Sequence, residues 1–398
     1  MPWPVVWFMI PYGRQNISEA DIEAVGAVLR SDFLTQGPAV PRFEESIARA
    51  VDAPHAVAFS SATAALHIAC LALGLGPGDW LWTVPNTFVA SANCALYCGA
   101  EVDFVDIDAQ TRNISVNALA RKLDKAEREK KLPKIVVPVD FAGTSVDLAG
   151  IRALADRYGF YVLEDASHGI GGTYRNRPVG CGDMADVTVF SFHPVKLITT
   201  GEGGAVTTRS AEIARRLRLL RSHGISRDPA DMTRSPDGGW YYEQIALGFN
   251  YRMTDIQAAL GLSQLARLPE FVARRQAIAA RYFDALAALP VIRQSVPDDT
   301  ISALHLYVIE LDDSVRIPRA KVFAAMRDAG IGVNVHYIPV HLQPYYQAKG
   351  FKRDDFPVAE RYYERALTLP LYPDLSVDDQ DYVIRKLGKV LGNLGADL

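Results

Sequence analysis

The chain of 398 residues has only four cysteines, and this scarcity excludes a protein held together by disulfides. Cys70, Cys94, Cys98 and Cys181 stand in apolar stretches, which fits buried structural thiols and a reducing cytoplasm. Cys94 and Cys98 share a helical face, but no histidine or further cysteine follows closely enough to complete a metal site. The eight histidines also lack a ligand spacing such as HExxH, so we expect no metal.

The sequence also lacks a strong charge of one sign and a long hydrophobic run. Charged residues make up 22% of the chain and sum to a net charge of −4, so no basic field favours a nucleic-acid partner. The most apolar end, "MPWPVVWFMIPYG", has no positive n-region, breaks at Pro4 and Pro11, and is too short to cross a bilayer. We expect a cytoplasmic protein without membrane contact, whose N-terminal residues form an extended arm on the body.

What the sequence has in abundance is apolar surface in a regular alternation. Hydrophobic residues make up 49% of the chain, which is enough for a large core, and the length favours two domains. Over residues 55–192, strand-like runs such as "HAVAFS", "KIVVPVDF", "FYVLEDA" and "DVTVFSF" alternate with helical patterns such as "TAALHIACLALGL" and "DLAGIRALADRYG". This alternation predicts an α/β fold with a mainly parallel sheet covered on both faces. In such folds, sites gather at the carboxyl ends of the strands.

The second half of the chain has a different pattern. A long helical stretch over residues 253–289 links the large body to residues 304–311, 318–330 and 332–341, which we interpret as strand, helix and strand. We therefore predict a large domain with the N-terminal arm over residues 1–260, and the linking helix with a small C-terminal α+β domain over 261–398. Residues 222–240 are rich in turn formers and predict a long surface loop.

Lys196 occupies an unusual position in the stretch "VFSFHPVKLITTGEGGAV". A lysine at the end of a buried strand is costly unless it reaches outward to solvent, or its amine is neutral and covalently engaged. A desolvated lysine with a lowered pKa is what Schiff-base chemistry requires. The glycines that follow would let the backbone approach a planar group without interference from a Cβ atom. An ordinary surface lysine explains the same stretch.

Two further strand ends complement this lysine. Asp165 in "YVLEDASHGIGG" closes an apolar strand, and a buried carboxylate needs a cationic partner such as a pyridinium nitrogen, with a helix N-cap as the alternative. Ser60, Ser61 and Thr63 in "AFSSATAALH" stand at a helix start whose free amides favour a phosphate, although N-capping alone accounts for them. Ser191 offers another hydroxyl. A lysine, an aspartate and a phosphate cradle together describe a site for pyridoxal phosphate.

With these motifs in place, the chain resembles the DegT/DnrJ/EryC1/StrS family of fold-type I aminotransferases, which act on nucleotide-linked keto-sugars. The resemblance covers almost the whole chain and is strongest in "EDASHG", "FSFHPVKLITTGEGGAV", "GFNYRMTDIQAALG" and "HYIPVH". It implies a pyridoxal-phosphate-dependent enzyme with a large, mainly parallel domain and a smaller C-terminal α+β domain. One branch of the family carries histidine in place of the lysine and removes a hydroxyl, so the presence of Lys196 favours transamination.

The resemblance also implies roles for single residues. Lys196 would hold the cofactor covalently and move a proton between the donor and the cofactor, and Asp165 would keep the pyridine nitrogen protonated. The other expected cofactor contacts are Ala62, Thr63 and Ser191 at the phosphate, Phe88 and His168 at the ring, and Asn250 at the phosphate of the other subunit of a homodimer. Phe88 as a core residue and His168 as a satisfied polar residue are the alternatives. We expect His193 to be structural or to position the substrate.

The substrate class rests on two strings, "IPYGRQNISEADIEAVGAVLRSDFLTQGP" and "SFHPVKLITTGEGGAV". They are most similar to the branch that makes UDP-4-amino-4,6-dideoxy-N-acetyl-β-L-altrosamine on the route to pseudaminic acid. This implies L-glutamate as the amine donor and a UDP-linked 4-keto-6-deoxy-hexosamine as the acceptor. The expected substrate contacts are Arg227, His336, Tyr337 and His341, for which ordinary surface residues are the alternative. The resemblance also implies that Thr35 and Gln36 lie near the sugar, because the family folds its N-terminal segment over the site.

Two other functions remain open at this stage. The same chemistry would serve another nucleotide keto-sugar, such as a perosamine, bacillosamine or aminoarabinose precursor, and hydrogen bonds to single hydroxyls would decide between them. A non-enzymatic regulator that binds pyridoxal phosphate is the alternative from a different class. Such regulators carry an appended DNA-binding unit, and the sequence shows no basic helix-turn-helix pattern.

Overall fold

The computed structural model describes residues 9–393. The predicted N-terminal arm falls partly on residues 1–8, which lie outside the described part. From Ile10 onward the chain runs beside the C-terminal part of the sequence, and Ile10 forms a parallel β-bridge with Ile331. The backbone N–H of Gly332 donates to the carbonyl of Ile10 at 2.7 Å, and that of Leu371 donates to Tyr12 at 3.0 Å.

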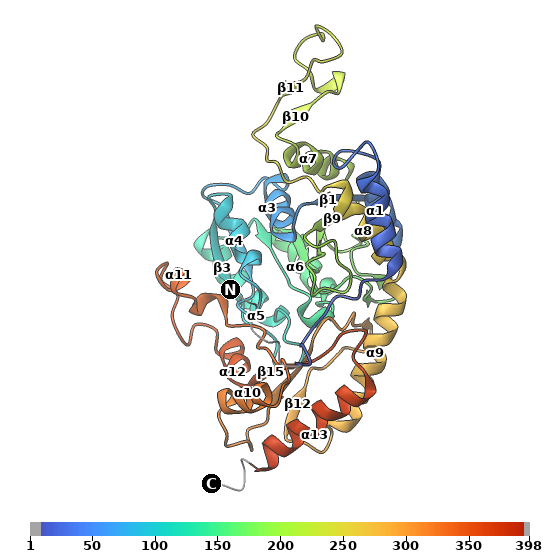
Figure 1. Cartoon of the computed structure of the whole chain (residues 1–398). Coiled ribbons are helices and arrows are strands. Elements are labelled where there is room, and N and C mark those ends of the chain that lie inside the picture. Colours follow the sequence, from blue (N-terminus) through green and yellow to red (C-terminus); the bar gives the residue numbers. More distant parts are fainter. Residues whose placement is uncertain (1–8, 394–398) are drawn as a thin grey trace.

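A seven-stranded sheet forms the centre of the molecule (Figure 1). Its strands are β1 (His55–Phe59), β2 (Trp80–Thr83), β3 (Glu101–Phe104), β4 (Ile135–Val136), β5 (Tyr161–Asp165), β8 (Val187–Ser191) and β9 (Gly204–Thr208). They lie in the order β1-β9-β8-β5-β4-β2-β3. All neighbouring pairs are parallel except the two that involve β9, which is antiparallel to both β1 and β8. The predicted α/β class with a mainly parallel sheet is confirmed, and β9 was not foreseen.

Different helices cover the two faces of this sheet. They are α1 (Glu19–Leu29), α2 (Ala39–Ala50), α3 (Ala62–Ala72), α4 (Ala90–Tyr97), α5 (Val116–Glu129), α6 (Leu148–Tyr158), α7 (Ala211–Arg221) and α8 (Asp255–Ala266). Successive strand residues point to opposite faces, so Val57 and Phe59 of β1 pack in one core cluster with α3 and α7. Ala56 and Ala58 pack in another with α2 and α8. Burial on both faces explains why the strands are almost continuously apolar.

The C-terminal part has its own small antiparallel sheet, in the order β12-β14-β15. Its elements are α9 (Leu268–Ala285), β12 (Val291–Arg293), β14 (Tyr307–Leu311), α10 (Arg319–Asp328), η3 (Val340–Leu342), α11 (Pro344–Gln347), α12 (Pro357–Arg365), β15 (Ala366–Leu369) and α13 (Val377–Asn393). A separate apolar cluster, which includes Ile309, Met326 and Leu387, fills the space between this sheet and its helices. The strand and helix predicted at 304–311 and 318–330 correspond to β14 and α10.

Two predictions in this half were wrong in detail. Residues 332–341 do not form a strand, because Pro339 has no N–H to donate and the N–H groups of Val335 and Tyr337 are taken by the side chains of Asn334 and Asn86. The single helix predicted over 253–289 is two helices, α8 and α9, which meet at Arg267 with a proline in the first turn of α9. The domain boundary predicted at residue 260 falls inside α8 and stays a prediction.

Two smaller antiparallel units complete the fold. One consists of β13 (Thr300–Ile301), β6 (Thr173–Tyr174) and β7 (Arg177–Pro178), and η1 (Phe141–Gly143) is a tight turn after β4. The other is a hairpin of β10 (Ile225–Ser226) and β11 (Glu243–Gln244), with η2 (Pro229–Asp231) between them, and it projects from the top of the body in Figure 1. The predicted loop at 222–240 is therefore an arm, and its residue Trp240 is 75% exposed.

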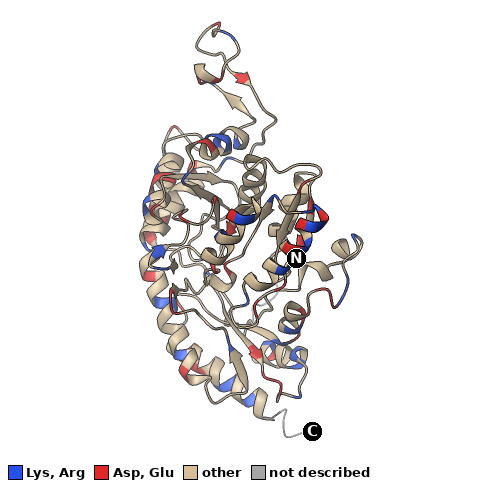
Figure 2. Cartoon of the chain, turned by 180° about the vertical axis from the view of Figure 1, so that it is seen from behind, with Lys and Arg blue, Asp and Glu red and all other residues tan. Residues whose placement is uncertain are grey.

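Charge is spread over the molecule without separation of sign. Figure 2 shows basic and acidic residues interspersed along the outer helices in the view from behind. Between residues 9 and 393, no helix is long and apolar enough to cross a membrane. The same residues contain no group of three or more histidine, cysteine or acidic side chains arranged to hold a metal ion.

Candidate active site

Lys196 lies in the turn-rich segment that joins β8 to β9. Its backbone N–H donates to the carbonyl of His193 at 2.9 Å, which closes a turn directly after the strand. The side chain is half-buried. Burial lowers the pKa of the Lys196 amine to about 8, and the negative charge of Asp165 partly opposes this shift. A substantial fraction of the amine is therefore neutral near pH 7.5, as a nucleophile requires.

Asp165 is the last residue of β5 and is 3% exposed. Its Oδ2 accepts a hydrogen bond of 2.6 Å from the Ser91 hydroxyl on α4, and its Oδ1 accepts one of 3.1 Å from the Ser167 N–H. Thr87 lies 2.8 Å from the Ser91 hydroxyl and extends this buried chain of polar groups. These bonds hold the carboxylate in one orientation with further acceptor capacity for a cationic N–H.

Ser91 was missed by the sequence analysis. It is 1% exposed and stands 74 positions before Asp165, so no local pattern links the two residues. The only signal was indirect, because α4 follows the carboxyl end of β2 and such helix starts face the site edge of the sheet.

An anion cradle lies at the start of α3. The Ser61 hydroxyl accepts from the N–H of Ala64 at 3.1 Å and caps the helix, whereas the N–H groups of Ala62 and Thr63 belong to the first turn and have no intrahelical acceptor. Ser191 ends β8 nearby, since its register partner on β9 is Gly204. The exposed N–H groups and the positive end of the helix favour a phosphate.

Gly204 permits this arrangement. A Cβ atom at this position would lie 2.6 Å from the Ala62 nitrogen and 2.7 Å from its Cα. The close approach is therefore between the backbone of β9 and the start of α3, and it corrects the expectation that this glycine would face a planar ligand.

His168 lies on the turn after β5 and contacts residues from the C-terminal half. Its Nε2 is 3.2 Å from the Tyr337 hydroxyl, and its ring centroid is 4.3 Å from that of His305. Burial, followed by the positive charge of Lys196, lowers the pKa of His168 well below its usual value, so the ring is neutral at pH 7. Its Nδ1 is buried and has no hydrogen-bond partner within residues 9–393. Such an orphaned atom is available to a bound group.

His336 and Tyr337 join the two halves of the molecule at this point. The Nδ1 atom of His336 is 2.8 Å from the Thr368 hydroxyl, and the Tyr337 N–H donates to the Asn86 side chain at 3.2 Å. Burial and the charge of Lys196 lower the pKa of His336 to about 3. Both residues were predicted substrate contacts, and both lie beside His168.

His341 has a different environment from its neighbours. It is 0% exposed, its Nε2 lies 2.9 Å from Glu360, and its ring packs against Phe356. A ring without exposed surface cannot contact a substrate, so this expectation is corrected and His341 is structural. The sequence did not reveal this because "HYIPVH" places two histidines close together, whereas the second one belongs to the turn η3.

Five other predicted residues lie on the surface of the single chain. Phe88 is 60% exposed at the start of α4, so it is not a core residue. Thr35 and Gln36 are exposed beside the start of α8, where Thr35 pairs with Thr254. Asn250 is exposed at the base of the projecting hairpin, and Arg227 is exposed on the hairpin itself. No hydrogen bond or ion pair in the described part connects these five residues to Lys196 or Asp165.

The arrangement fits pyridoxal phosphate. The start of α3 with Ser191 suits the phosphate, Asp165 suits the ring nitrogen, and the Lys196 amine suits the covalent link, while the orphaned His168 nitrogen is available at the side of the ring. These four features come from α3, β5, β8 and the turn after β5, all at the same edge of the sheet.

Comparison with known proteins gives consistent results. Residues 15–388 match the DegT/DnrJ/EryC1/StrS aminotransferase family. The chain is 43% identical over 392 residues to the spore coat polysaccharide biosynthesis protein SpsC of Bacillus subtilis, with 98% of both chains covered.

Two of the similar solved structures are described as aminotransferases. A putative sugar aminotransferase of Streptococcus pneumoniae in its PMP form has a TM-score of 0.88 at 30% identity, covering 97% of this chain and 100% of that one. It is also known in a PLP form, with a TM-score of 0.87. PseC of Helicobacter pylori, an aminotransferase involved in the biosynthesis of pseudoaminic acid, has a TM-score of 0.87 at 30% identity, again covering 97% and 100%.

Proposed function

We propose a substrate pair for this chain. The chain belongs to the DegT/DnrJ/EryC1/StrS aminotransferase family and is a pyridoxal-phosphate-dependent sugar aminotransferase of fold type I. It moves the amino group of L-glutamate to C4 of a UDP-linked 4-keto-6-deoxy-N-acetylhexosamine. The product is UDP-4-amino-4,6-dideoxy-N-acetyl-β-L-altrosamine. The observation that carries the choice of sugar is the similarity to PseC over almost the full length of both chains.

The residues of this chain have distinct tasks in that reaction. When bound, pyridoxal phosphate supplies an electron-withdrawing ring that stabilises negative charge on the carbon next to the reacting nitrogen. Lys196 accepts the proton from that carbon and returns it at the other end of the transfer, as its lowered pKa suits. Asp165 keeps the ring nitrogen protonated and is itself oriented by Ser91. Ala62, Thr63 and Ser191 hold the phosphate, and His168 borders the ring.

The substrate contacts come from two groups of residues. His336 and Tyr337 line the side of the site formed by the C-terminal half, next to His168. The rings of His168 and His336 are neutral, because burial and the charge of Lys196 lower their pKa values. They therefore bind hydroxyl or carbonyl groups rather than the charge of the diphosphate.

We assign the exposed residues to the site of a second copy in a homodimer. Asn250 and Arg227 lie on or below a hairpin that extends away from its own body (Figure 1). Apolar side chains stand near them, with Trp240 at 75% and Leu247 at 81% exposure. Exposed apolar surface of this kind favours an interface. Thr35, Gln36 and Phe88 belong to the same shared site.

Transfer to C4 of a different nucleotide keto-sugar is the second candidate. It is favoured by the higher identity, 43%, to a protein of spore coat polysaccharide biosynthesis. A perosamine, bacillosamine or aminoarabinose precursor would require the same lysine, aspartate and cradle. Only the contacts to individual sugar hydroxyls would differ.

The visible spectrum of the protein loaded with pyridoxal phosphate tests the reaction. L-Glutamate should bleach the absorption band, and the UDP-4-keto sugar should restore it, while Lys196→Ala should complete neither change. Restoration by another nucleotide keto-sugar alone would establish the second candidate. A band that L-glutamate does not bleach would contradict the choice of amine donor.

Mixing two inactive variants tests the shared site. If Asn250 serves the other subunit, random exchange between Lys196→Ala and Asn250→Ala dimers rebuilds one intact site in each mixed dimer, and about a quarter of the wild-type activity returns. If both residues serve the same site, no activity returns. Sedimentation of the wild-type protein as a monomer would contradict the dimer itself.

A further inference from the structure

A pair of buried acids lies directly behind Asp165. Asp140 follows β4 and is 0% exposed, and Glu164 precedes Asp165 on β5 and is 1% exposed. One oxygen of each carboxyl group is satisfied. The Oδ1 atom of Asp140 accepts from the Val146 N–H at 3.0 Å, and the Oε2 atom of Glu164 accepts from the Thr188 hydroxyl at 2.7 Å.

The other two oxygens have no donor. The Oδ2 atom of Asp140 and the Oε1 atom of Glu164 are buried, and no N–H or O–H group within residues 9–393 reaches either one. Val139 is the parallel partner of Asp165, so by alternation the side chains of Asp140 and Glu164 lie next to each other on the same face of the sheet, and a hydrogen bond between them contributes to the pKa of each. Two ionised carboxylates in that position would repel each other and leave two acceptors unsatisfied. A single proton between them satisfies both oxygens at once.

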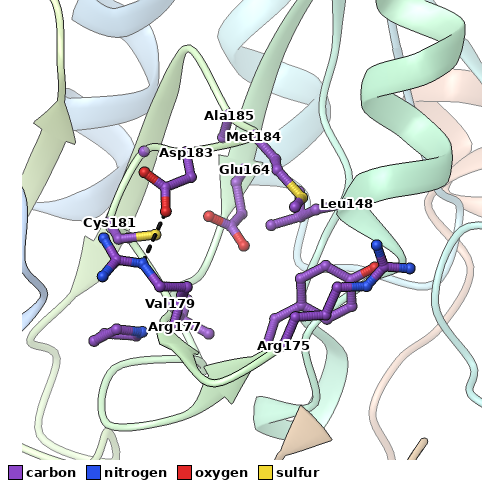
Figure 3. A pocket seen from close by; sticks show the side chains of 13 residues that line it. Leu148, Glu164, Arg175, Arg177, Val179, Cys181, Asp183, Met184 and Ala185 are labelled. Atoms are coloured by element: carbon purple, nitrogen blue, oxygen red, sulfur yellow. Dashed lines mark hydrogen bonds and ion pairs between the residues drawn. The ribbon is translucent and has the colours of Figure 1, made fainter. Parts of the chain in front are cut away.

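Among residues 9–393, no cation pairs with either of these acids from the other side. Figure 3 shows Glu164 directed into a pocket of about 100 Å³ whose walls include Leu148, Val179, Met184 and Ala185. The two arginines at the pocket are engaged elsewhere, since Arg177 pairs with Asp183 and Asp52, and Arg175 pairs with Asp299. The surroundings of Glu164 therefore favour a protonated pair over two negative charges.

The acid pair is also attached to the turn that carries the site. The Asp140 N–H donates to the carbonyl of Asp165 at 3.1 Å. A Cβ atom on Gly169 would lie 2.8 Å from Oδ2 of Asp140, so the turn after β5 packs directly on this carboxyl group. Asp165 itself points to the face of the sheet that bears α4, whereas Glu164 and its register partner Thr188 point to the opposite face.

We propose that Asp140 and Glu164 share one proton at neutral to mildly alkaline pH, and that this acid pair is a positioning device for Asp165 and His168. The assignment to cofactor binding rests on the function proposed above, whereas the shared proton does not. The proton replaces a salt bridge and holds the turn from Asp165 to Gly169 against the segment after β4, while the pair carries one negative charge instead of two.

The direction of the pKa shifts agrees with this geometry. Burial, followed by the charge of Glu164, raises the pKa of Asp140 well above its usual value, and burial raises the pKa of Glu164 to about 7. Because the charge of Glu164 raises the pKa of Asp140, Asp140 holds the proton when Glu164 ionises above about pH 7, and Glu164 then accepts the hydrogen bond. The charged or titratable groups that border the pair are Asp165 at the end of β5 and the pocket residues Tyr174, Arg175, Arg177, Cys181 and Asp183.

Infrared spectroscopy of the purified full chain tests the shared proton. At about pH 8 ordinary carboxyl groups are ionised, so a protonated carboxylic acid gives a separate C=O stretch. We expect this band in the wild type and its loss in both Glu164→Gln and Asp140→Asn, because each amide supplies the bridging N–H in place of the proton. Asp183→Asn is the matched control from the same pocket and should retain the band. Absence of the band from the wild type, or its persistence in both amide variants, overturns the proposal.

Cofactor binding tests the positioning role. The dissociation constant for pyridoxal phosphate should stay within about twofold of the wild type in Glu164→Gln, which keeps the hydrogen bond, and should rise about tenfold in Glu164→Leu, which breaks it. Equal affinities in the two variants overturn the positioning role. If the leucine variant does not fold, the infrared band of the wild type and its loss in the glutamine variant still test whether the two acids share a proton. They also decide it if the protein binds no pyridoxal phosphate, an outcome that defeats the proposed function alone.

Discussion

Replacement of Gly204 by alanine should damage the phosphate cradle in a measurable way. The new Cβ atom would lie 2.6 Å from the Ala62 nitrogen, whereas ordinary contact begins at 3.4 Å, so the start of α3 and β9 must separate by 3.4 − 2.6 = 0.8 Å. Both partners are backbone, and β9 is held between β1 and β8, so the strain falls on the helix start. Overpacking of this kind costs about 1–3 kcal/mol of unfolding free energy.

The functional consequence is separable from the loss of stability. A displaced helix start moves the N–H groups of Ala62 and Thr63 relative to Ser191, so the phosphate is held less well. We expect the dissociation constant for pyridoxal phosphate to rise by about tenfold or more in Gly204→Ala. Pyridoxal, which lacks the phosphate, should react with Lys196 as it does in the wild type.

Two controls make this result decisive. Gly76→Ala meets no atom within 4 Å and should change neither cofactor affinity nor the urea unfolding midpoint. The reasoning would be refuted if Gly204→Ala bound pyridoxal phosphate with wild-type affinity, or if its affinities for pyridoxal and pyridoxal phosphate fell by the same factor. The first result would show that the close approach is not rigid, and the second that the damage is not local to the phosphate.

Three further predictions follow from buried charges. Ser91→Ala removes the charge-assisted hydrogen bond to Asp165 and should lower the free energy of unfolding, measured by urea titration, by about 1.5–3 kcal/mol. A loss below about 0.5 kcal/mol would contradict this role of Ser91. The rate at which the apoprotein captures pyridoxal phosphate should rise with pH, reach half its maximum near pH 8 and level off above that, because burial lowers the pKa of Lys196 to about 8 and only the neutral amine attacks. A midpoint at the ordinary lysine pKa, near 10.5, would mean an unperturbed lysine. Arg112→Met leaves the buried Glu310 without its partner and should destabilise the protein by about 3–5 kcal/mol, and the double replacement with Glu310→Leu should recover most of this loss.

The parts of the fold that the sequence predicted share a short-range cause. The strands β1, β5 and β8 and the helices α3 and α6 are visible because each is a continuous apolar run or a helical repeat with its own caps. β9 was missed because its "GAVTT" run follows glycines that read as a turn, and only pairing with β1 and β8 makes it a strand.

The candidate site divides in a similar way. Lys196, Asp165 and the start of α3 each stand at the end of a recognisable strand, so the sequence predicted their type and the edge of the sheet where they lie. His341 was assigned wrongly because its motif gives no information on burial against Glu360 and Phe356. The roles of Thr35, Gln36, Arg227 and Asn250 depend on a second copy of the chain and stay predictions.

The sequence by itself determined the α/β class and the family, and it predicted a catalytic lysine with an aspartate and a phosphate cradle, because these depend on local periodicity and on short motifs. Only the tertiary structure decided which groups surround those residues. Ser91 reaches Asp165 across 74 positions, His168 meets Tyr337 across 169, and Asp140 in the segment after β4 lies beside Glu164 of β5. Such contacts are fixed by strand order and helix packing, and burial in turn sets the pKa values on which the chemistry of Lys196 depends.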